Sequence, residues 1–438
     1  MQNYTETLRN KLHTLICEMG KHPECFCRNP GKDFTRNRKL PFEKVLSILL
    51  GMSGDPLRNE LMEAFHHDPS MASVPAFVQQ RSKLLPNALA YLFHRCTDSC
   101  IIPKSYRGYR LLAADGSDLQ IPANPQDNDS YVAPNNGSMH YNLLHLNALY
   151  DLCTGGYLDA VIQKYRTQNE YRALIQMTER SPITEPVILI ADRGYESYNV
   201  IEHIAHKGWN YLLRLRDSDG ILSGISLPDN TQEFDISVHL LLTRKQTNAV
   251  KTLLREQPDK YHFLPANVTF DFLPQKSDGF YPVSFRIVRF PLSDTSTETL
   301  ITNLDSDRFP PEELKKLYHV RWGIETSFRH LKYTIGLRQF QSKKADHITQ
   351  EIFARLIMYN FCEWITSHVV IHSKSSKYTY QANFAAAVHI CRLFFWSNIS
   401  PPNAEALIAR HIVPFRPDRS SPRRLKPSNF NGFFYRIA

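Results

Sequence analysis

The stretch Val187-Ile-Leu-Ile-Ala-Asp192-Arg-Gly-Tyr195 determines how the rest of this sequence is interpreted. Its first five residues are apolar and rich in β-branched side chains, and a run this short predicts a strand that is buried on both faces. Asp192 then stands at the carboxyl end of that strand, where Gly194 permits a turn. Ligands of α/β sheets bind at this edge, although Asp before Gly is also ordinary turn chemistry.

A second stretch has the same form. Leu111-Leu-Ala-Ala-Asp115-Gly-Ser117 places an aspartate after four apolar residues and a glycine directly behind it. We therefore expect Asp115, like Asp192, to lie at the carboxyl end of a buried strand. Both aspartates are candidate functional residues, because this edge of an α/β sheet is where ligands bind.

The pattern of apolar residues divides the chain into regions. A 3.6-residue period marks the N-terminal part, short apolar runs with intervening helical segments follow, and a Pro-rich alternating stretch contains a helical period only near Val238 to Leu254. We expect an α/β protein with a mixed sheet, a β-rich insertion and an all-helical N-terminal domain. The expected regions are a helical N-terminal domain, the first part of the core, the β-rich insertion, the remainder of the core and a basic C-terminal region, at residues 1–106, 107–216, 217–300, 301–372 and 373–438.

The polar faces of the N-terminal helices carry basic and amide side chains: Arg36, Arg38, Lys39, Arg58, Gln79, Gln80, Arg81 and Lys83. In a helix-turn-helix arrangement these side chains would lie along a phosphate backbone. A solvated helix face explains them equally well. The basic tail after Pro414 would likewise follow phosphates or simply keep the protein in solution.

The segment Tyr318-His-Val-Arg321-Trp-Gly-Ile-Glu325-Thr-Ser-Phe-Arg329-His-Leu-Lys332 has helical periodicity. Apolar residues form one stripe, so one side of the helix is predicted to be buried. Gly323 leaves a break in the helix possible. At about 100° per residue the polar members share an arc of about 80°: Tyr318, Arg321, Glu325, Arg329 and Lys332. A surface helix with ion pairs four residues apart is the simpler alternative.

Two carboxylates at strand ends and one on a helix suit metal-assisted phosphoryl transfer. Asp115, Asp192 and Glu325 can together hold two Mg²⁺ ions about 3.5 to 4 Å apart, which activate an attacking hydroxyl and stabilise the leaving oxygen. Arg329 and Lys332, about one and two turns farther along the helix, would hold a polyanionic substrate. The sequence has no Gly-rich phosphate loop, so we expect no nucleotide cofactor.

The composition is that of an ordinary globular protein and admits a nucleic-acid partner. The 438 residues include 52 Lys and Arg against 43 Asp and Glu, a formal net charge of +9, with 42% hydrophobic and 22% charged residues. The eight cysteines are scattered, so we interpret them as reduced thiols without a metal. No stretch is long and apolar enough for a membrane span.

The combined motifs resemble those of DDE transposases of bacterial insertion sequences, specifically the IS-four family. Tyr318, Arg321, Glu325 and Lys332 match that family's Y-x2-R-x3-E-x6-K signature, and the two aspartates precede it in the expected order. The resemblance covers nearly the whole chain. It implies an RNase H-like catalytic core made of residues 107–216 and 301–372, interrupted by the β-rich insertion and preceded by a helical DNA-binding domain.

The resemblance also implies the reaction, the cofactor and the partners. Asp115, Asp192 and Glu325 would bind Mg²⁺, for which Mn²⁺ would substitute, and would support endonucleolytic cutting of transposon ends and strand transfer into target DNA. The predicted DNA contacts are Tyr318, Arg321, Arg329, Lys332, Arg193 and Tyr195. The partners would be double-stranded DNA, namely terminal inverted repeats and a target, with a homodimer on paired ends. The protein would act in the bacterial cytoplasm, associated with the nucleoid when bound to DNA.

One feature of some relatives is missing. Their β insertion carries a Trp that stabilises a flipped base during hairpin formation, whereas the four Trp residues of this chain lie elsewhere. An aromatic residue of the insertion would have to stack instead, although core packing explains most of these rings: Tyr261, Phe263, Phe272, Phe280 and Tyr281. The hairpin intermediate is therefore left open.

Two other functions use the same residues. A nuclease or resolvase with this core would hydrolyse DNA without strand transfer and would need no paired ends. A DNA-binding protein derived from a transposase would have lost catalysis, but the complete set of Asp115, Asp192 and Glu325 counts against it. Replacing Asp192 with Asn distinguishes the readings, because only an active enzyme would lose its reaction.

Overall fold

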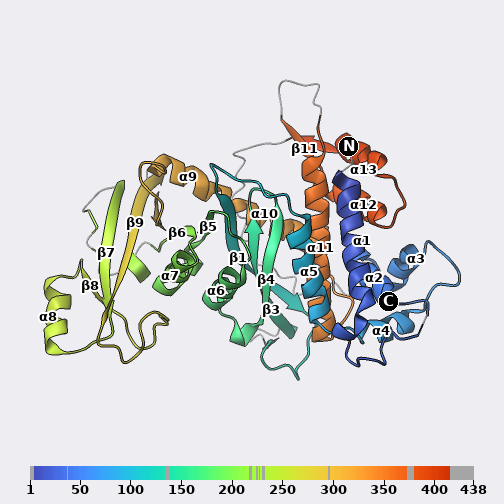
Figure 1. Cartoon of the computed structure of the whole chain (residues 1–438), viewed down its shortest axis with the longest axis horizontal. Coiled ribbons are helices and arrows are strands. Elements are labelled where there is room, and N and C mark those ends of the chain that lie inside the picture. The colour runs from blue at the N-terminus through green and yellow to red at the C-terminus, as the bar shows by residue number, and fades with distance from the viewer. Residues whose placement is uncertain are drawn as a thin grey trace.

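The computed structural model describes residues 4–36, 38–133, 139–216, 220–222, 225, 227–228, 232–293, 296–371 and 379–414, and the structural statements below concern these residues. A ten-stranded sheet extends from one end of the molecule to its centre (Figure 1). Helices from the N-terminal part and from the C-terminal part of the chain lie together at the other end. The basic tail after Pro414, a candidate for phosphate binding, lies outside the described residues.

The described residues form a mixed α/β structure with a large sheet, as the sequence predicts, and helices precede the first strand. The strands are β1 (Arg110–Ile121), β2 (Tyr131–Val132), β3 (Tyr141–Asp151), β4 (Gly156–Lys164), β5 (Val187–Ala191), β6 (Asn210–Arg214), β7 (Phe234–Thr243), β8 (Tyr261–Phe263), β9 (Phe280–Ser293), β10 (Ser296–Thr302), β11 (Tyr380–Ala382) and β12 (Ile412–Pro414). The α-helices are α1 (Tyr4–Lys21), α2 (Phe42–Gly51), α3 (Leu57–Ala64), α4 (Val74–Arg81), α5 (Asn87–Cys100), α6 (Glu170–Arg180), α7 (Tyr198–His206), α8 (Asn248–Glu256), α9 (Pro311–Val320), α10 (Trp322–Arg329), α11 (Ala345–His368), α12 (Phe384–Phe395) and α13 (Pro401–Arg410).

Strand β1 lies at the centre of the core part of the sheet. It pairs in parallel with β5 and antiparallel with β3, while β6 continues in parallel beyond β5 and β4 lies antiparallel on the far side of β3. The resulting order is β4-β3-β1-β5-β6. All five residues of β5 are buried, as its unbroken apolar sequence predicts for a strand covered on both faces.

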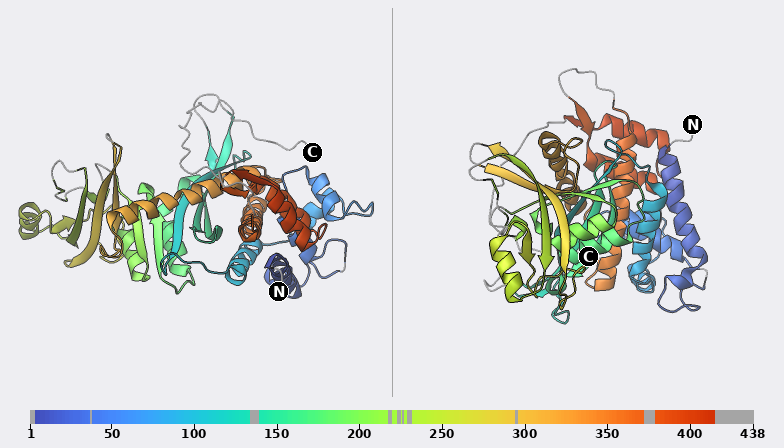
Figure 2. Two further views of the ribbon diagram at one scale, coloured as in Figure 1. Left: turned by 90° about the horizontal axis from the view of Figure 1, so that it is seen from above. Right: turned by 60° about the vertical axis from the view of Figure 1, so that its left-hand side comes forward.

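Helices cover both faces of these strands. Side chains of a strand alternate between faces, so Leu189 packs with α6 and α7, whereas Ile188 and Ile190 pack with α9 on the opposite face. The two further views show these helices on opposite sides of the sheet (Figure 2). The edge at which β1 and β5 carry their aspartates therefore lies between two helical layers.

The β-rich insertion extends the same sheet instead of forming a separate one. Strand β10 pairs antiparallel with β6, β9 pairs with β10, β7 pairs with β9 and β8 adds the last edge. The predicted helical period from Val238 to Leu254 is wrong in its first half: residues up to Thr243 continue β7, and the helix is α8. Pairing with β9 outweighs the local helical pattern.

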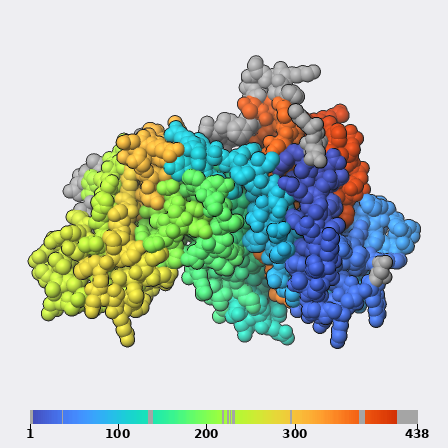
Figure 3. All heavy atoms as spheres, viewed as in Figure 1, coloured from blue at the N-terminus to red at the C-terminus, as the bar shows by residue number. Residues whose placement is uncertain are grey.

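The helical end of the molecule is built from both parts of the chain. The long helix α11 packs against α1, α2 and α5 on the N-terminal side and against α12 and α13 on the C-terminal side. The side chains of all these helices belong to one hydrophobic core, which continues to Ala113 of β1 and Ile324 of α10. On the face drawn in Figure 3, N-terminal helices in blue lie beside C-terminal helices in red. No helix in the described part of the chain is long and apolar enough to cross a membrane.

A buried ion pair joins this helical end together. Arg81 of α4 and Glu351 of α11 are each 2% exposed, with 2.9 Å between Arg81 Nη1 and Glu351 Oε1. Arg81 Nε also donates a hydrogen bond to Gln350 Oε1 at 3.1 Å. The prediction that Arg81 belongs to a polar, phosphate-facing surface is therefore wrong. Its charge is directed inward, because α11 supplies a carboxylate that the local sequence does not reveal.

Breaking this pair should destabilise the protein strongly. We expect Arg81→Met to lower the free energy of unfolding by about 3 to 5 kcal/mol, because it leaves the Glu351 carboxylate buried without its cation. Urea denaturation measures the change. Arg58→Met, at an exposed position of α3, is the control and should stay within about 0.5 kcal/mol of the parent. Adding Glu351→Leu to Arg81→Met should restore stability, and a double variant less stable than Arg81→Met would contradict the pairing.

Candidate active site

The two aspartates lie at neighbouring positions of two parallel strands. The β1–β5 ladder ends with Ala114 beside Ala191, so Asp115 and Asp192 are the next residue on each strand. Asp192 leaves the sheet as predicted and caps a short 3-10 turn, where Gly194 N donates to its Oδ1 at 2.8 Å. The prediction that Asp115 ends its strand is wrong: β1 continues to Ile121, because β3 still pairs with it on the other side.

Glu325 comes to the same place on α10. Arg321 Nη2 donates a hydrogen bond to Glu325 Oε1 at 2.8 Å, and the Arg321 guanidinium lies 5.5 Å from the centre of the Tyr318 ring. A Cβ placed on Gly323 would lie 2.9 Å from Leu152 Cδ2, so glycine permits the helix to approach the β3–β4 connection closely. The expected single helix is interrupted at Arg321, although that residue keeps helical dihedral angles and the stripe continues.

The three carboxylates act on one another electrostatically. Burial raises the pKa of Asp115 to about 7, and the charges of Asp192 and Glu325 contribute to the increase. The Gly116 N–H, which donates to Asp115 Oδ1 at 2.9 Å, and the Arg321 cation oppose it. The site therefore concentrates more negative charge than its own donors and cations compensate, which favours a bound cation.

The donor set suits a hard divalent cation. All three side chains offer oxygen, which Mg²⁺ and Mn²⁺ prefer. Within the described ranges no group of three or more His, Cys, Asp or Glu side chains is already arranged to hold a metal ion. Mg²⁺ does not need one, because it keeps several water ligands and is bound through one or two carboxylates together with substrate phosphates.

The predicted DNA contacts fall into two groups. Arg329 of α10 and Arg193 of the turn after β5 are exposed, and Lys332 is half-buried with its Nζ donating to the Asp118 carbonyl at 2.9 Å. These three remain predicted contacts. Tyr318 and Arg321 are 4% and 6% exposed, so in this conformation they support Glu325 from beneath rather than face solvent. Tyr195 is 1% exposed, and its predicted contact with DNA is wrong for this conformation because its ring packs in the core.

A π-helical turn at His330–Thr334 follows α10 and carries Lys332. The extra residue in such a turn changes the direction of the side chains that follow, and π turns are frequent at functional sites. Here Lys332 reaches across to the backbone of β1. The amphipathic pattern predicts an α-helix through Lys332, and no residue pattern in the segment signals the extra residue.

The structure adds a group that the sequence analysis missed. His145 of β3 lies opposite Asp118 of β1, and its ring bridges two carboxylates: Nδ1 is 2.7 Å from Asp118 Oδ1 and Nε2 is 2.9 Å from Glu170 Oε1. Burial lowers the pKa of His145, but the hydrogen bonds and charges of both carboxylates outweigh it and raise the pKa to about 9. A His within an otherwise apolar strand was the available signal, but the β1–β3 register was needed to find its partners.

Two glycines leave room for this group beside the aspartates. A Cβ on Gly116 would lie 2.3 Å from His145 Nε2 and 2.5 Å from Glu170 Oε1. A Cβ on Gly194 would lie 2.9 Å from Asp192 Oδ1 and 3.5 Å from Glu170 Oε2. Gly116 and Gly194 thus leave room for the carboxylates and the imidazole, and neither has a positive φ that would by itself require glycine.

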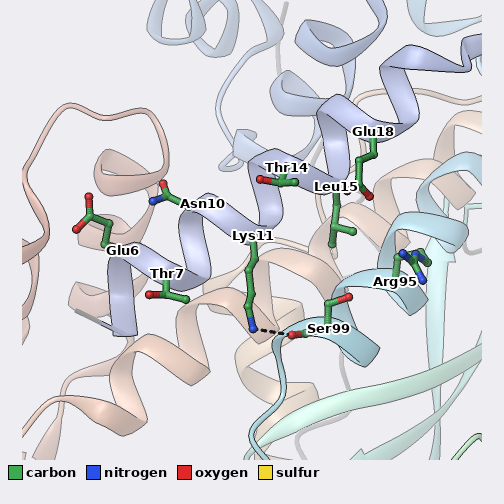
Figure 4. Close-up of a pocket in the computed structure, with 9 residues that line it drawn as sticks. All are labelled: Glu6, Thr7, Asn10, Lys11, Thr14, Leu15, Glu18, Arg95 and Ser99. Carbon is green, nitrogen blue, oxygen red and sulfur yellow. Dashed lines mark hydrogen bonds between the residues drawn. The ribbon is translucent and has the colours of Figure 1, made fainter. Parts of the chain in front are cut away.

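A surface hollow between α1 and α5 lies away from this site (Figure 4). Lys11 Nζ donates to the Ser99 carbonyl across it at 2.9 Å. Its walls carry acidic residues, Glu6 and Glu18, together with basic residues, Lys11 and Arg95. Because these charges balance, the hollow presents no single charge to a ligand, and we place the active site at the carboxylates.

The site thus combines two aspartates at the end of a parallel ladder with a helix that carries a glutamate and cations. Residues 106–361 match the family described as the transposase DDE domain, so the chain belongs to that family. The IS-four resemblance is confirmed by the Escherichia coli K12 transposase InsG for insertion sequence element IS4. That protein is 22% identical over 391 residues, which cover 84% of this chain and 80% of the relative.

Two further proteins are similar. The putative transposase y4zB of Sinorhizobium fredii NGR234 is 33% identical over 87 residues, which are 20% of this chain and 24% of that protein. Among solved structures, the piggyBac transposase in a cryo-EM synaptic complex with hairpin DNA has a TM-score of 0.45 and 8% identity. That similarity covers 95% of this chain and 86% of the other.

The close packing around Gly116 can be tested by adding a methyl group. We expect Gly116→Ala to lower the free energy of unfolding by about 1 to 3 kcal/mol, because His145 or Glu170 must move. Gly279→Ala, where the nearest atom would be 3.4 Å away, is the control for urea denaturation. In a His145→Ala background the Gly116 substitution should cost less, and equal costs in both backgrounds would contradict this contact.

The raised pKa of Asp115 predicts a pH-dependent stability in the metal-free protein. Between about pH 4 and pH 7 the folded carboxyl holds a proton that the unfolded chain has lost, so its ionisation costs stability as pH rises toward 7. We expect Asp115→Asn to have a free energy of unfolding higher than that of the parent by on the order of 2 kcal/mol at pH 8, with a smaller gain at pH 5, as measured by urea denaturation. Asp278→Asn, whose side chain is 84% exposed, is the control. A gain independent of pH would contradict the assignment.

Proposed function

We propose that this transposase cuts the ends of its own mobile element and joins the freed 3′ hydroxyl to target DNA. The observation that carries the proposal is the placement of Asp115 and Asp192 side by side at the end of the β1–β5 ladder, with Glu325 near enough to influence Asp115. The strand order β4-β3-β1-β5-β6, in which only β3 runs against its neighbours, supports an RNase H-like core.

Asp115, Asp192 and Glu325 would hold Mg²⁺, or Mn²⁺ in its place. Bound cations would supply activation of the attacking hydroxyl and stabilisation of the leaving oxygen. Arg321 holds Glu325 toward the aspartates through its 2.8 Å hydrogen bond and limits the repulsion among the three carboxylates. No group of the chain needs to act as a nucleophile, because the oxygen of water or of the DNA 3′ end attacks.

The cations beside the carboxylates would bind the DNA backbone. Arg193 and Arg329 are exposed on the turn after β5 and on α10, respectively, and Lys332 lies at the end of the same helical segment. Each is able to neutralise a phosphate and release its counterions. Among the described residues the buried Tyr318 hydroxyl has no hydrogen-bond partner, so it would be able to donate to a phosphate if DNA binding exposed it.

The partners follow from the reaction. The protein would bind the terminal inverted repeats and a target duplex in the bacterial cytoplasm, as a homodimer that holds two ends together. Exposed basic residues of the N-terminal part, including Arg36, Arg38 and Arg58, provide a second phosphate-binding surface. Two-site binding of this kind would fix the ends relative to the carboxylates.

The deciding experiment compares the purified parent protein with Asp192→Asn. Both are incubated with Mg²⁺ and DNA that carries the ends flanking the gene, and the products are separated as nicks, double-strand breaks, hairpins and joined molecules. We expect cleaved and joined products from the parent and none from Asp192→Asn, with equal binding to the ends. The loss should exceed 10³-fold, because the variant lacks a ligand for the cation that stabilises the transition state.

Other outcomes would replace the proposal. Cleavage without joining would indicate a nuclease or resolvase that performs no strand transfer. Tight binding to the ends without cleavage by either protein would indicate a DNA-binding derivative. Glu405→Gln, at the helical end on α13, is a matched control that removes a carboxylate far from the aspartates and should leave the products unchanged.

A further inference from the structure

Glu170 begins α6 and turns its carboxylate toward the two aspartates. The same hypothetical Cβ on Gly194 would touch Asp192 Oδ1 at 2.9 Å and Glu170 Oε2 at 3.5 Å, so these oxygens border one small space. The Glu170 side chain is 36% exposed. Its Oε1 is occupied by His145, whereas the hydrogen bonds of the described residues leave Oε2 available on the side of Asp192.

The second carboxylate oxygen of Glu170, Oε1, is held by His145. His145 is held between Glu170 and Asp118, and Asp118 lies three residues beyond Asp115 on the same strand. Lys332 Nζ donates to the backbone carbonyl of Asp118, so the motif lysine contacts the same group from the opposite layer. A carboxylate anchored through one oxygen, with the other directed at a second carboxylate, would be repelled unless a cation lay between them.

A buried hydroxyl lies near enough to these carboxylates for their charges to act on it. Tyr195 is 1% exposed, and its hydroxyl has no hydrogen-bond partner among the described residues. Burial raises the pKa of this phenol, and the charges of Glu170, Asp115 and Asp192 raise it further. The negative charges of all three carboxylates therefore act on this hydroxyl. A buried donor without an acceptor is costly, and a cation's water ligand would provide the missing partner.

We propose that Glu170 is a fourth carboxylate of the divalent-cation site, in which its Oε2 binds the cation on the side of Asp192 and His145 is its positioning residue. The inference rests on the proposed function, because it concerns the same cation site. Four carboxylates would supply more negative charge for two cations than the family motif alone. The small residue Gly194 leaves room between Asp192 and Glu170, and Gly116 leaves room for Glu170 and His145.

The test measures cation binding without the reaction. The full-length protein without DNA is titrated with Ca²⁺ and separately with Mg²⁺, and the rise in its unfolding temperature gives the apparent affinity. We expect the concentration for a half-maximal rise to increase about 10-fold in Glu170→Gln. Glu185→Gln, which removes an exposed carboxylate before the opposite end of β5, should behave like the parent. Asp192→Asn should lose the response.

A separate set of variants tests the role of His145. His145→Ala should weaken the cation response like Glu170→Gln, and His145→Gln, whose amide can still donate to Glu170, should recover part of it. A merely structural role would lower the starting unfolding temperature without changing the half-maximal concentration. If Glu170→Gln does not fold, Glu170→Asp keeps the charge but shortens the reach, and it should also weaken the response.

The possible results separate this inference from the proposed function. A normal cation response in Glu170→Gln, together with a lost response in Asp192→Asn, would overturn the role of Glu170 alone. A parent protein whose unfolding temperature does not respond to either cation would overturn the cation site as a whole, and the inference with it.

Discussion

The parallel register of β1 and β5 is the constraint on which the rest of the site depends. It brings Asp115 and Asp192 to adjacent positions, where two negative charges repel each other in a partly buried environment. The neighbouring elements each reduce that cost: Gly116 donates its N–H, Gly194 donates to Asp192, and Arg321 brings a positive charge together with Glu325. What remains uncompensated is negative charge, which a bound cation would neutralise.

Packing at the helical end of the molecule positions Glu325 relative to Asp115 and Asp192. Helix α10 must hold Glu325 at a fixed height above β1, and its buried face shares one core with Ala113 of β1 and with α11. Helix α11 is in turn fixed by segments from both parts of the chain, including the buried pair between Arg81 and Glu351. The position of Glu325 is thus set by contacts among residues that lie far apart in the sequence.

Local patterns predicted what depends on nearby residues. The apolar run of β5 with Asp192 behind it, the position of Glu325 on an amphipathic helix and the β-rich insertion all follow from periodicity and turn chemistry. The continuation of β1 beyond Asp115, the burial of Tyr195 and the inward direction of Arg81 did not. Each depends on a partner distant in sequence, and strand register or helix packing decides it only in the folded chain. The contacts of His145 belong to the same class, because its two carboxylates come from β1 and α6.

The continuity of the sheet has a mechanical consequence. Hydrogen-bonded ladders run without interruption from β1 through β5, β6, β10 and β9 to β7, so the insertion is attached along the length of a strand and not by a flexible connector. Force applied along the outermost strands would act on these ladders in shear. Many hydrogen bonds would then resist it together. The insertion is consequently held at a fixed orientation relative to the edge that carries Asp115 and Asp192, and the twist of the sheet sets the angle between them.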